Sequence, residues 1–297
     1  MWSHFATFFN GEELFQLTPN IIYEFFNSMI NENYTYGTLL SYRSAMYRPI
    51  KSLIKDYDLV KDDTLCNLLK FAKTHLKKHS SEDVWDLDKV VVYLKSIDDR
   101  QDVDLVFKKC FFLVLLANPK RISEFKAFVI SKIVFFDDNS IILKPHSKFL
   151  SKNHTNKFCP KNISIPQFPQ DLSICPVRHL KMYLSLTKRI CSHLKIKRPE
   201  CLWIDSKGKP LNLHKMRSWF RDIVLHADPQ ATVKSTNFHS IRGVAASALE
   251  FKGASISEIA QQMQWSNEST FINFYSKLQL KAYRPAVIAG IQTAAIQ

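Results

Sequence analysis

The sequence lacks the features that mark metal-binding, membrane and repeat proteins. Its six cysteines form no C-x-x-C pair, which argues against a structural zinc site. His75 and His79 have the i, i+4 spacing of a metal pair, but no third ligand follows at a suitable spacing. The most apolar run, residues 105–117, contains Lys108 and Lys109 and is too short to span a bilayer. We therefore expect no metal site and no membrane segment, and the sequence shows no internal repeat.

Acidic residues are scarce, and their shortage is confined to one part of the chain. The 297 residues include 27 acidic and 41 basic ones, for a net charge of +14. Residues 1–83 hold 9 basic and 10 acidic residues, whereas residues 84–297 hold 32 and 17. This excess favours a polyanionic partner for the C-terminal part. No signal peptide precedes the cysteines, so a reduced intracellular compartment is expected.

The length and the apolar content predict two domains, each with a core of its own. The chain is 46% hydrophobic and contains 22 phenylalanines. Near the N-terminus, apolar stripes of helical period begin at Thr18-Pro19 and run through residues 38–54 and 64–76. Residues 77–83 are polar and without periodicity, which indicates a linker. The expected domains are a helical bundle, residues 1–80, and a larger domain, residues 81–297.

The larger domain is expected to combine helices with a small sheet. Residues 104–117 predict a buried helix, and residues 129–168 contain short β-rich runs separated by turns. The loop 144–161 within this region holds five lysines, two histidines and no acid, which favours a polyanion as its partner. The predicted fold class is therefore mainly α with a small antiparallel sheet of about three strands, α+β. Further helices are expected at residues 88–97, 174–186 and 213–225.

The stretch 237–278 predicts three consecutive short helices that hold polar groups in place. His239 and Arg242 are three residues apart and so share a face of the first helix. Ser255 and Glu258 have the spacing of a capping box at the start of the second helix. The side chains that these helices position are His239, Arg242, Trp265 and Tyr275.

These motifs carry a family resemblance. HSIRGVA at residues 239–245 and TFINFY at 270–275 resemble the tyrosine recombinases of the phage-integrase-like family, most closely those of eukaryotic mobile elements of the Crypton and DIRS-like types. CPVR at 175–178 is similar to the same group, and RISE at 121–124, after a core helix, resembles the first-arginine box. The family's catalytic pattern is Arg, Lys, His-x-x-Arg, His or Trp, Tyr. The resemblance thus implies a recombinase catalytic domain behind a helical domain that clamps DNA.

The resemblance also implies roles for individual residues. Tyr275 would attack phosphorus and form a 3′-phosphotyrosyl link. Arg121 and Arg242 would hold the non-bridging oxygens of the phosphate bidentately. Trp265 would donate its indole N–H to the same phosphate, and His239 would accept a proton or bind the phosphate. The bond energy is kept in the intermediate, so no cofactor and no ATP is needed.

The general acid is expected on the basic hairpin, with two candidates. The pattern Phe-x-x-Lys of the mobile-element recombinases is similar to residues 149–152 and favours Lys152. The spacing from Arg121 in phage and bacterial relatives favours Lys148 instead. Tyr283 is a weaker second candidate for the nucleophile.

The partner implied by the resemblance is double-stranded DNA. The family also implies a homo-oligomer, a dimer on DNA and a tetramer in synapsis, and the mobile-element likeness implies a nuclear location. Candidate DNA contacts, each of which is equally compatible with an ordinary solvated side chain, are Thr38, Ser41, Arg43, Lys144, Lys148, Lys157, Lys215 and Arg217.

Two other functions fit part of the pattern. A type IB topoisomerase would use the same chemistry to relax supercoils as a monomer. A DNA-binding descendant of a transposon recombinase would keep the fold and lose catalysis. The HSIRGVA and CPVR segments and the retained catalytic residue types favour the recombinase.

Overall fold

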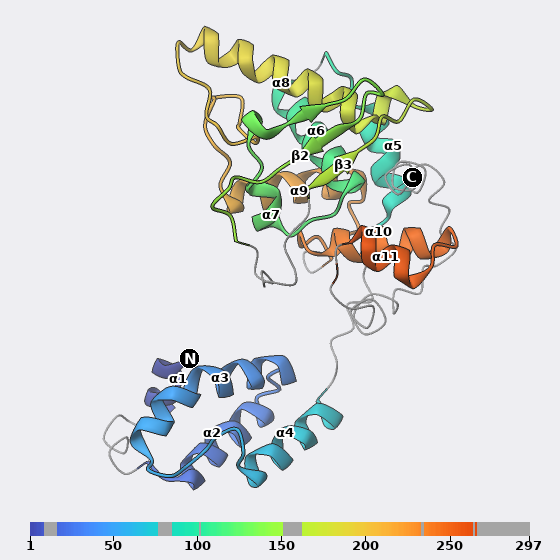
Figure 1. Ribbon diagram of the computed structural model, residues 1–297. Helices are drawn as coiled ribbons and strands as arrows, with labels where there is room; N and C mark the ends of the chain where they lie inside the picture. Colours follow the sequence, from blue (N-terminus) through green and yellow to red (C-terminus); the bar gives the residue numbers. More distant parts are fainter. Residues whose placement is uncertain are drawn as a thin grey trace. The chain divides into compact units, whose positions relative to one another are not determined.

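The computed structural model describes residues 1–8, 17–76, 85–100, 102–150, 162–232, 235–263 and 265. The chain divides into two compact units, residues 1–80 and 81–297 (Figure 1). The expected fold class is confirmed, because helices dominate and the described strands form one three-stranded antiparallel sheet. No helix within these residues is long and apolar enough to cross a membrane.

The N-terminal unit is a helical bundle around an aromatic core. Phe25 is fully buried and meets Phe5 and Phe26 edge-on, with ring centroids 5.0 and 5.8 Å away. The side chains of Thr35 and Asp62 accept hydrogen bonds from backbone N–H groups and so begin two of the helices. The helices are α1 (Trp2–Phe8), α2 (Pro19–Asn31), α3 (Tyr36–Leu53) and α4 (Asp63–His75).

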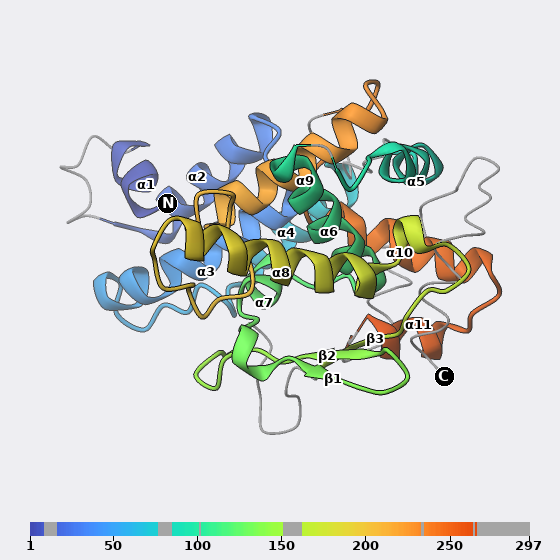
Figure 2. The same ribbon diagram turned by 90° about the horizontal axis from the view of Figure 1, so that it is seen from above.

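The second unit is built around one helix, α6 (Val103–Ala117). All its residues from Cys110 to Ala117 are buried, as the unbroken apolar run predicts. Phe111 meets Trp203 and Trp219 edge-on at 5.2 and 5.7 Å. Figure 2 shows α6 among the neighbouring helices of this unit. The helices packed with it are α5 (Leu87–Ser96), α8 (Pro176–His193) and α9 (Leu213–Ala227).

The sheet consists of β1 (Val134–Phe135), β2 (Ile141–Leu143) and β3 (Ile163–Ile165) in the order β1-β2-β3. Alternate residues of β2 and β3 are buried, which fixes the register that pairs Ile141 with Ile165. The hairpin between β2 and β3 is the basic loop of the sequence, and its residues 151–161 lie outside the described part. Two single-turn helices flank the sheet in the chain, Ile130–Lys132 and Leu172–Ile174.

Three short elements complete the second unit: α7 (Ile122–Lys126), α10 (Ser240–Phe251) and α11 (Ile256–Gln262). The capping box expected at the start of α11 is confirmed, because the Ser255 and Glu258 side chains each bond the other's backbone N–H. The chain turns between α10 and α11 at Gly253, whose φ of +85° suits glycine. The third helix predicted in residues 237–278 lies outside the described residues.

Candidate active site

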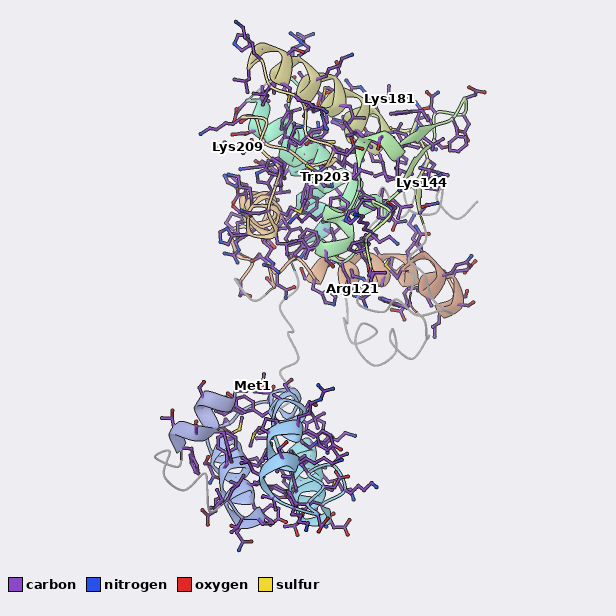
Figure 3. All side chains as sticks on the ribbon, turned by 60° about the vertical axis from the view of Figure 1, so that its left-hand side comes forward. Met1, Arg121, Lys144, Lys181, Trp203 and Lys209 are labelled. Atoms are coloured by element: carbon purple, nitrogen blue, oxygen red, sulfur yellow. The ribbon has the colours of Figure 1, made fainter. Side chains whose placement is uncertain are left out.

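Arg121 stands at the N-cap of α7, where the buried helix α6 has ended in a turn. Its Nη1 donates to Glu124 Oε1 at 3.3 Å, and its backbone N–H donates to Glu124 Oε2 at 3.4 Å. The guanidinium is therefore held from one side by a carboxylate, while 27% of the side chain stays exposed. Figure 3 shows Arg121 close to the helical segment coloured as α10 and α11, whereas Trp203 lies in the interior.

Arg242 lies on α10, with 3% of its surface exposed. Its Nη2 donates to the carbonyl of Met263 at 3.0 Å. Met263 is the C-cap of α11, where unpaired carbonyls concentrate partial negative charge. The guanidinium also lies over the ring of Trp265, with Cζ 5.5 Å from the ring centroid. Helix α11 and Trp265 together fix the direction of this arginine.

His239 lies at the N-cap of α10, so this helix begins one residue later than the prediction of a shared helical face required. The cap itself comes from Asn237, whose Oδ1 accepts from the backbone N–H groups of His239 and Ser240 at 2.8 and 3.0 Å. The imidazole is nevertheless close to both arginines. Desolvation, then the charges of Arg242 and Arg121, lower the pKa of His239, although the residue is exposed overall.

Lys120 belongs to the same cluster and was not among the site residues predicted from the sequence. Only 4% of it is exposed, and its Nζ is enclosed with no hydrogen-bond partner among the described residues. Burial lowers the pKa of Lys120 to about 7; Glu124 opposes this, and Arg242 and Arg121 add to it. The available signal was its position in the turn Asn118-Pro119-Lys120, directly before the RISE tetrapeptide.

The structure brings together four of the predicted or adjacent side chains and leaves others apart. Arg121, Arg242, His239 and Lys120 share one electrostatic environment, and Trp265 covers Arg242. Lys148 is exposed on the described part of the hairpin, and no described contact links it to this cluster. The predicted residues that lie outside the described part of the chain are Lys152, Lys157, Tyr275 and the second nucleophile candidate, Tyr283.

The remaining DNA-contact candidates lie on two helices and the hairpin. Lys215 and Arg217 are exposed on α9, and Lys144 is half-buried after β2 (labelled in Figure 3). On α3, the Thr38 hydroxyl bonds that of Thr35 at 2.9 Å, and the Ser41 hydroxyl donates to the Gly37 carbonyl at 2.9 Å. Arg43 is half-buried on the same helix. The two hydroxyls are engaged within their own helix.

The described cluster contains two arginines, a lysine whose pKa is lowered to about 7, and one acid, Glu124, which already pairs with Arg121. Such an imbalance in a largely buried place is suited to an anion that supplies the missing negative charge. Two guanidiniums can each make paired hydrogen bonds to a tetrahedral oxyanion. Within the described residues, no group of three or more His, Cys, Asp and Glu side chains could hold a metal ion.

A family model matches most of the second unit. The model of the phage integrase family matches residues 88–281. No curated protein sequence matches the chain.

Several solved structures share the fold. One is the Tn1549 transposon integrase in complex with transposon right end DNA, at 16% identity and a TM-score of 0.57, covering 86% of this chain and 80% of that one. XerH recombinase bound to a palindromic difH substrate matches at 14% identity and a TM-score of 0.56, covering 88% of this chain and 70% of that one. A lambda integrase dimer bound to a COC′ core site matches at 13% identity and a TM-score of 0.55, covering 90% of this chain and 82% of that one.

Proposed function

Because the chain belongs to the phage integrase family of tyrosine recombinases, we propose that it is a site-specific recombinase that cleaves and rejoins DNA through a 3′-phosphotyrosyl intermediate. One observation carries the proposal. Arg121 and Arg242 come from separate helices, and their charges act together on His239 and Lys120. Two arginines placed in this way suit the binding of one phosphate group. The excess of positive charge in the second unit suits the polyanion that carries this phosphate.

The two arginines neutralise the charge that develops on the phosphate during cleavage. Guanidiniums remain protonated at every physiological pH and present their donors in a rigid fork. Arg242 is aligned before any ligand arrives, because the Met263 carbonyl and the Trp265 ring hold it. Donors fixed in advance need no reorganisation in the transition state.

His239 and Trp265 have complementary roles. The lowered pKa of His239 keeps its imidazole neutral near pH 7, so that it can accept the proton of the attacking phenol. Trp265 donates its indole N–H to the phosphate and keeps Arg242 in place. Neither role requires a metal ion.

The nucleophile and the general acid complete the reaction. Tyr275 attacks phosphorus, the bond to the 5′ oxygen breaks, and Lys152 gives that oxygen its proton. Lys148 is the alternative acid. Attack by another 5′ hydroxyl on the phosphotyrosine then rejoins the strand, with no loss of bond energy and no ATP.

We propose further that the DNA belongs to a mobile element of the Crypton or DIRS-like type, which the protein integrates or excises in the nucleus. The motifs HSIRGVA and CPVR support this assignment. Strand exchange between two sites requires a dimer on each, hence a tetramer in synapsis. The N-terminal unit, residues 1–80, adds DNA contacts through Thr38, Ser41 and Arg43, and the second unit adds Lys144, Lys157, Lys215 and Arg217.

A suicide substrate tests the proposal. The binding site is first selected from a random-sequence duplex pool, and a nick is placed so that cleavage releases a short fragment. The full chain should form a covalent adduct that persists on a denaturing gel. Tyr275→Phe should form none, while the matched variant Tyr283→Phe should form it normally. Failure of the intact chain to form an adduct on its selected site would favour the catalytically silent DNA-binding reading.

The stoichiometry of the trapped complex separates recombinase from topoisomerase. Light scattering should find two duplexes with four protomers. A single protomer on one duplex, together with relaxation of supercoiled plasmid, would favour the topoisomerase.

A further inference from the structure

The described part of the second unit buries two lysines, Lys109 and Lys120, whose ammonium groups have different surroundings. Lys109 is 1% exposed, and its Nζ donates to the Ile97 carbonyl at 2.8 Å and pairs with Asp99 at 3.3 Å. Lys120 is 4% exposed, and no described residue accepts a hydrogen bond from its enclosed Nζ. A buried ammonium without a partner is expensive, so the position of Lys120 calls for an explanation that Lys109 does not need.

The charged groups around Lys120 do not balance it. Among the described residues, Glu124 is the acid that acts on Lys120, and this carboxylate already pairs with Arg121 at 3.3 Å. The charges of Arg242 and Arg121 repel a proton on Lys120. His239, near both arginines, has a lowered pKa and contributes no negative charge. The cluster is therefore poor in negative charge at the place where two arginines converge.

We propose that Lys120 is a third basic group of the phosphate site, an amine that takes up a proton from solvent when a phosphate binds between Arg121 and Arg242. The inference rests on the proposed function and adds a positioning residue to it. The amine acts through space and need not touch the phosphate. An incoming phosphate supplies the negative charge that the cluster lacks, and charge interactions are strong where water is excluded.

The pKa of Lys120 supports this reading, because it is about 7 in the free protein. Near neutral pH the amine is thus close to half protonated. A modest change in its surroundings therefore changes the fraction of the amine that is protonated. An adjacent anion favours the charged form and should raise this pKa to roughly 8 or above. Binding should then weaken as the pH rises, by about tenfold for each unit of pKa difference between the free and bound protein.

Nuclear magnetic resonance of the full chain with ¹³C-labelled lysine Cε atoms tests the proposal. Sulfate is the probe, because it mimics the phosphate and does not titrate between pH 6 and 10. The Lys120 signal is assigned by its loss in Lys120→Arg, and pH titrations are run in sulfate and in chloride at equal ionic strength. We expect a midpoint near 7 in chloride that moves to roughly 8 or above in sulfate. The Lys109 signal is the internal control and should not respond to sulfate.

The outcomes separate this inference from the proposed function. A second sample with ¹⁵N-labelled arginine reports on Arg121 and Arg242. If sulfate shifts their guanidinium signals but leaves the Lys120 midpoint unchanged, the inference is wrong and the phosphate site stands. If the Lys120 midpoint in chloride equals that of the ordinary lysines, the inference is likewise wrong and the phosphate site stands. If sulfate moves neither the arginines nor Lys120, the phosphate site itself is contradicted.

A pair of variants gives a second readout that a merely structural lysine would not move. With the selected duplex, the affinity of the unmodified chain should fall at least about fivefold between pH 7 and pH 9. Lys120→Arg keeps a permanent charge and Lys120→Met has none, so both should show a flat profile in this range. A variant that retained the original slope would assign the pH dependence to another group.

Discussion

The guanidinium of Arg242 lies over the indole ring of Trp265, with Cζ 5.5 Å from the ring centroid. Trp265 also donates its backbone N–H to the Ala260 carbonyl at 2.9 Å and packs on a small apolar cluster between α10 and α11. Trp265, which is anchored on α11, therefore helps to fix the position of the Arg242 guanidinium on α10. The pair gives Trp265 a supporting role in addition to the phosphate contact inferred from the family.

Two substitutions of Trp265 separate these roles. Trp265→Phe keeps an aromatic face for Arg242 but removes the N–H, so it should fold normally and cleave about 10- to 100-fold more slowly. Trp265→Ala removes both and should also lower the melting temperature. Thermal unfolding and single-turnover cleavage of the suicide duplex provide the two measurements. Equal cleavage by Trp265→Phe and the unmodified chain would refute the phosphate contact.

Arg242→Lys tests whether the fork geometry matters beyond charge. Lysine cannot hold the Met263 carbonyl and two phosphate oxygens together, so the cleavage rate should fall by at least about 100-fold. Arg189→Lys, on an exposed part of α8, is the matched control and should cleave normally. A near-normal rate for Arg242→Lys would mean that point charge alone suffices.

The buried Lys120 should make stability depend on pH. The pKa is 10.5 when unfolded and about 7 when folded, so between these values the unfolded chain binds more protons and stability rises with pH. Lys120→Met should therefore be more stable than the unmodified chain near pH 6, by at most about 5 kcal/mol, and this advantage should shrink toward pH 10. Urea unfolding at several pH values measures it, with Lys126→Met on α7 as the control. An advantage independent of pH would contradict the assignment.

The exposed basic residues of α9 should act through salt-dependent contacts. Removing one phosphate contact lowers the slope of log affinity against log salt by about 0.9. Lys215→Ala with Arg217→Ala should thus lower it by roughly 1.8 and leave the sequence preference unchanged. The pair Lys188→Ala and Arg189→Ala on α8 serves as the comparison. Equal slopes for both pairs would show that α9 does not face DNA.

The sequence predicted those parts of the fold that depend on local patterns. Residues 110–117 are apolar on all sides and form the fully buried part of α6, and the spacing of Ser255 and Glu258 predicted the start of α11. Helix α10 differs, because the Asn237 side chain caps it and leaves His239 just outside. The periodicity of the sequence alone could not show that the helix is capped by Asn237, two positions before His239.

The full set of residues in the site was harder to predict than the sequence motifs that contribute to it. Arg121 and Arg242 stand in recognisable tetrads, but Lys120 carries no motif, and its burial depends on elements distant in the chain. The pairing of Arg242 with the Met263 carbonyl is a backbone contact, which side-chain patterns do not reveal. The assignments of Tyr275 and Lys152 remain predictions from sequence, outside the described residues.

Identification of the DNA-linked peptide tests the central claim most directly. The trapped adduct would be digested with protease and nuclease, and the peptide carrying the residual nucleotide sequenced by mass spectrometry. The account predicts a nucleotide 3′-phosphate on Tyr275. A nucleotide on Tyr283 or on any other side chain, or one attached through its 5′-phosphate, would contradict it.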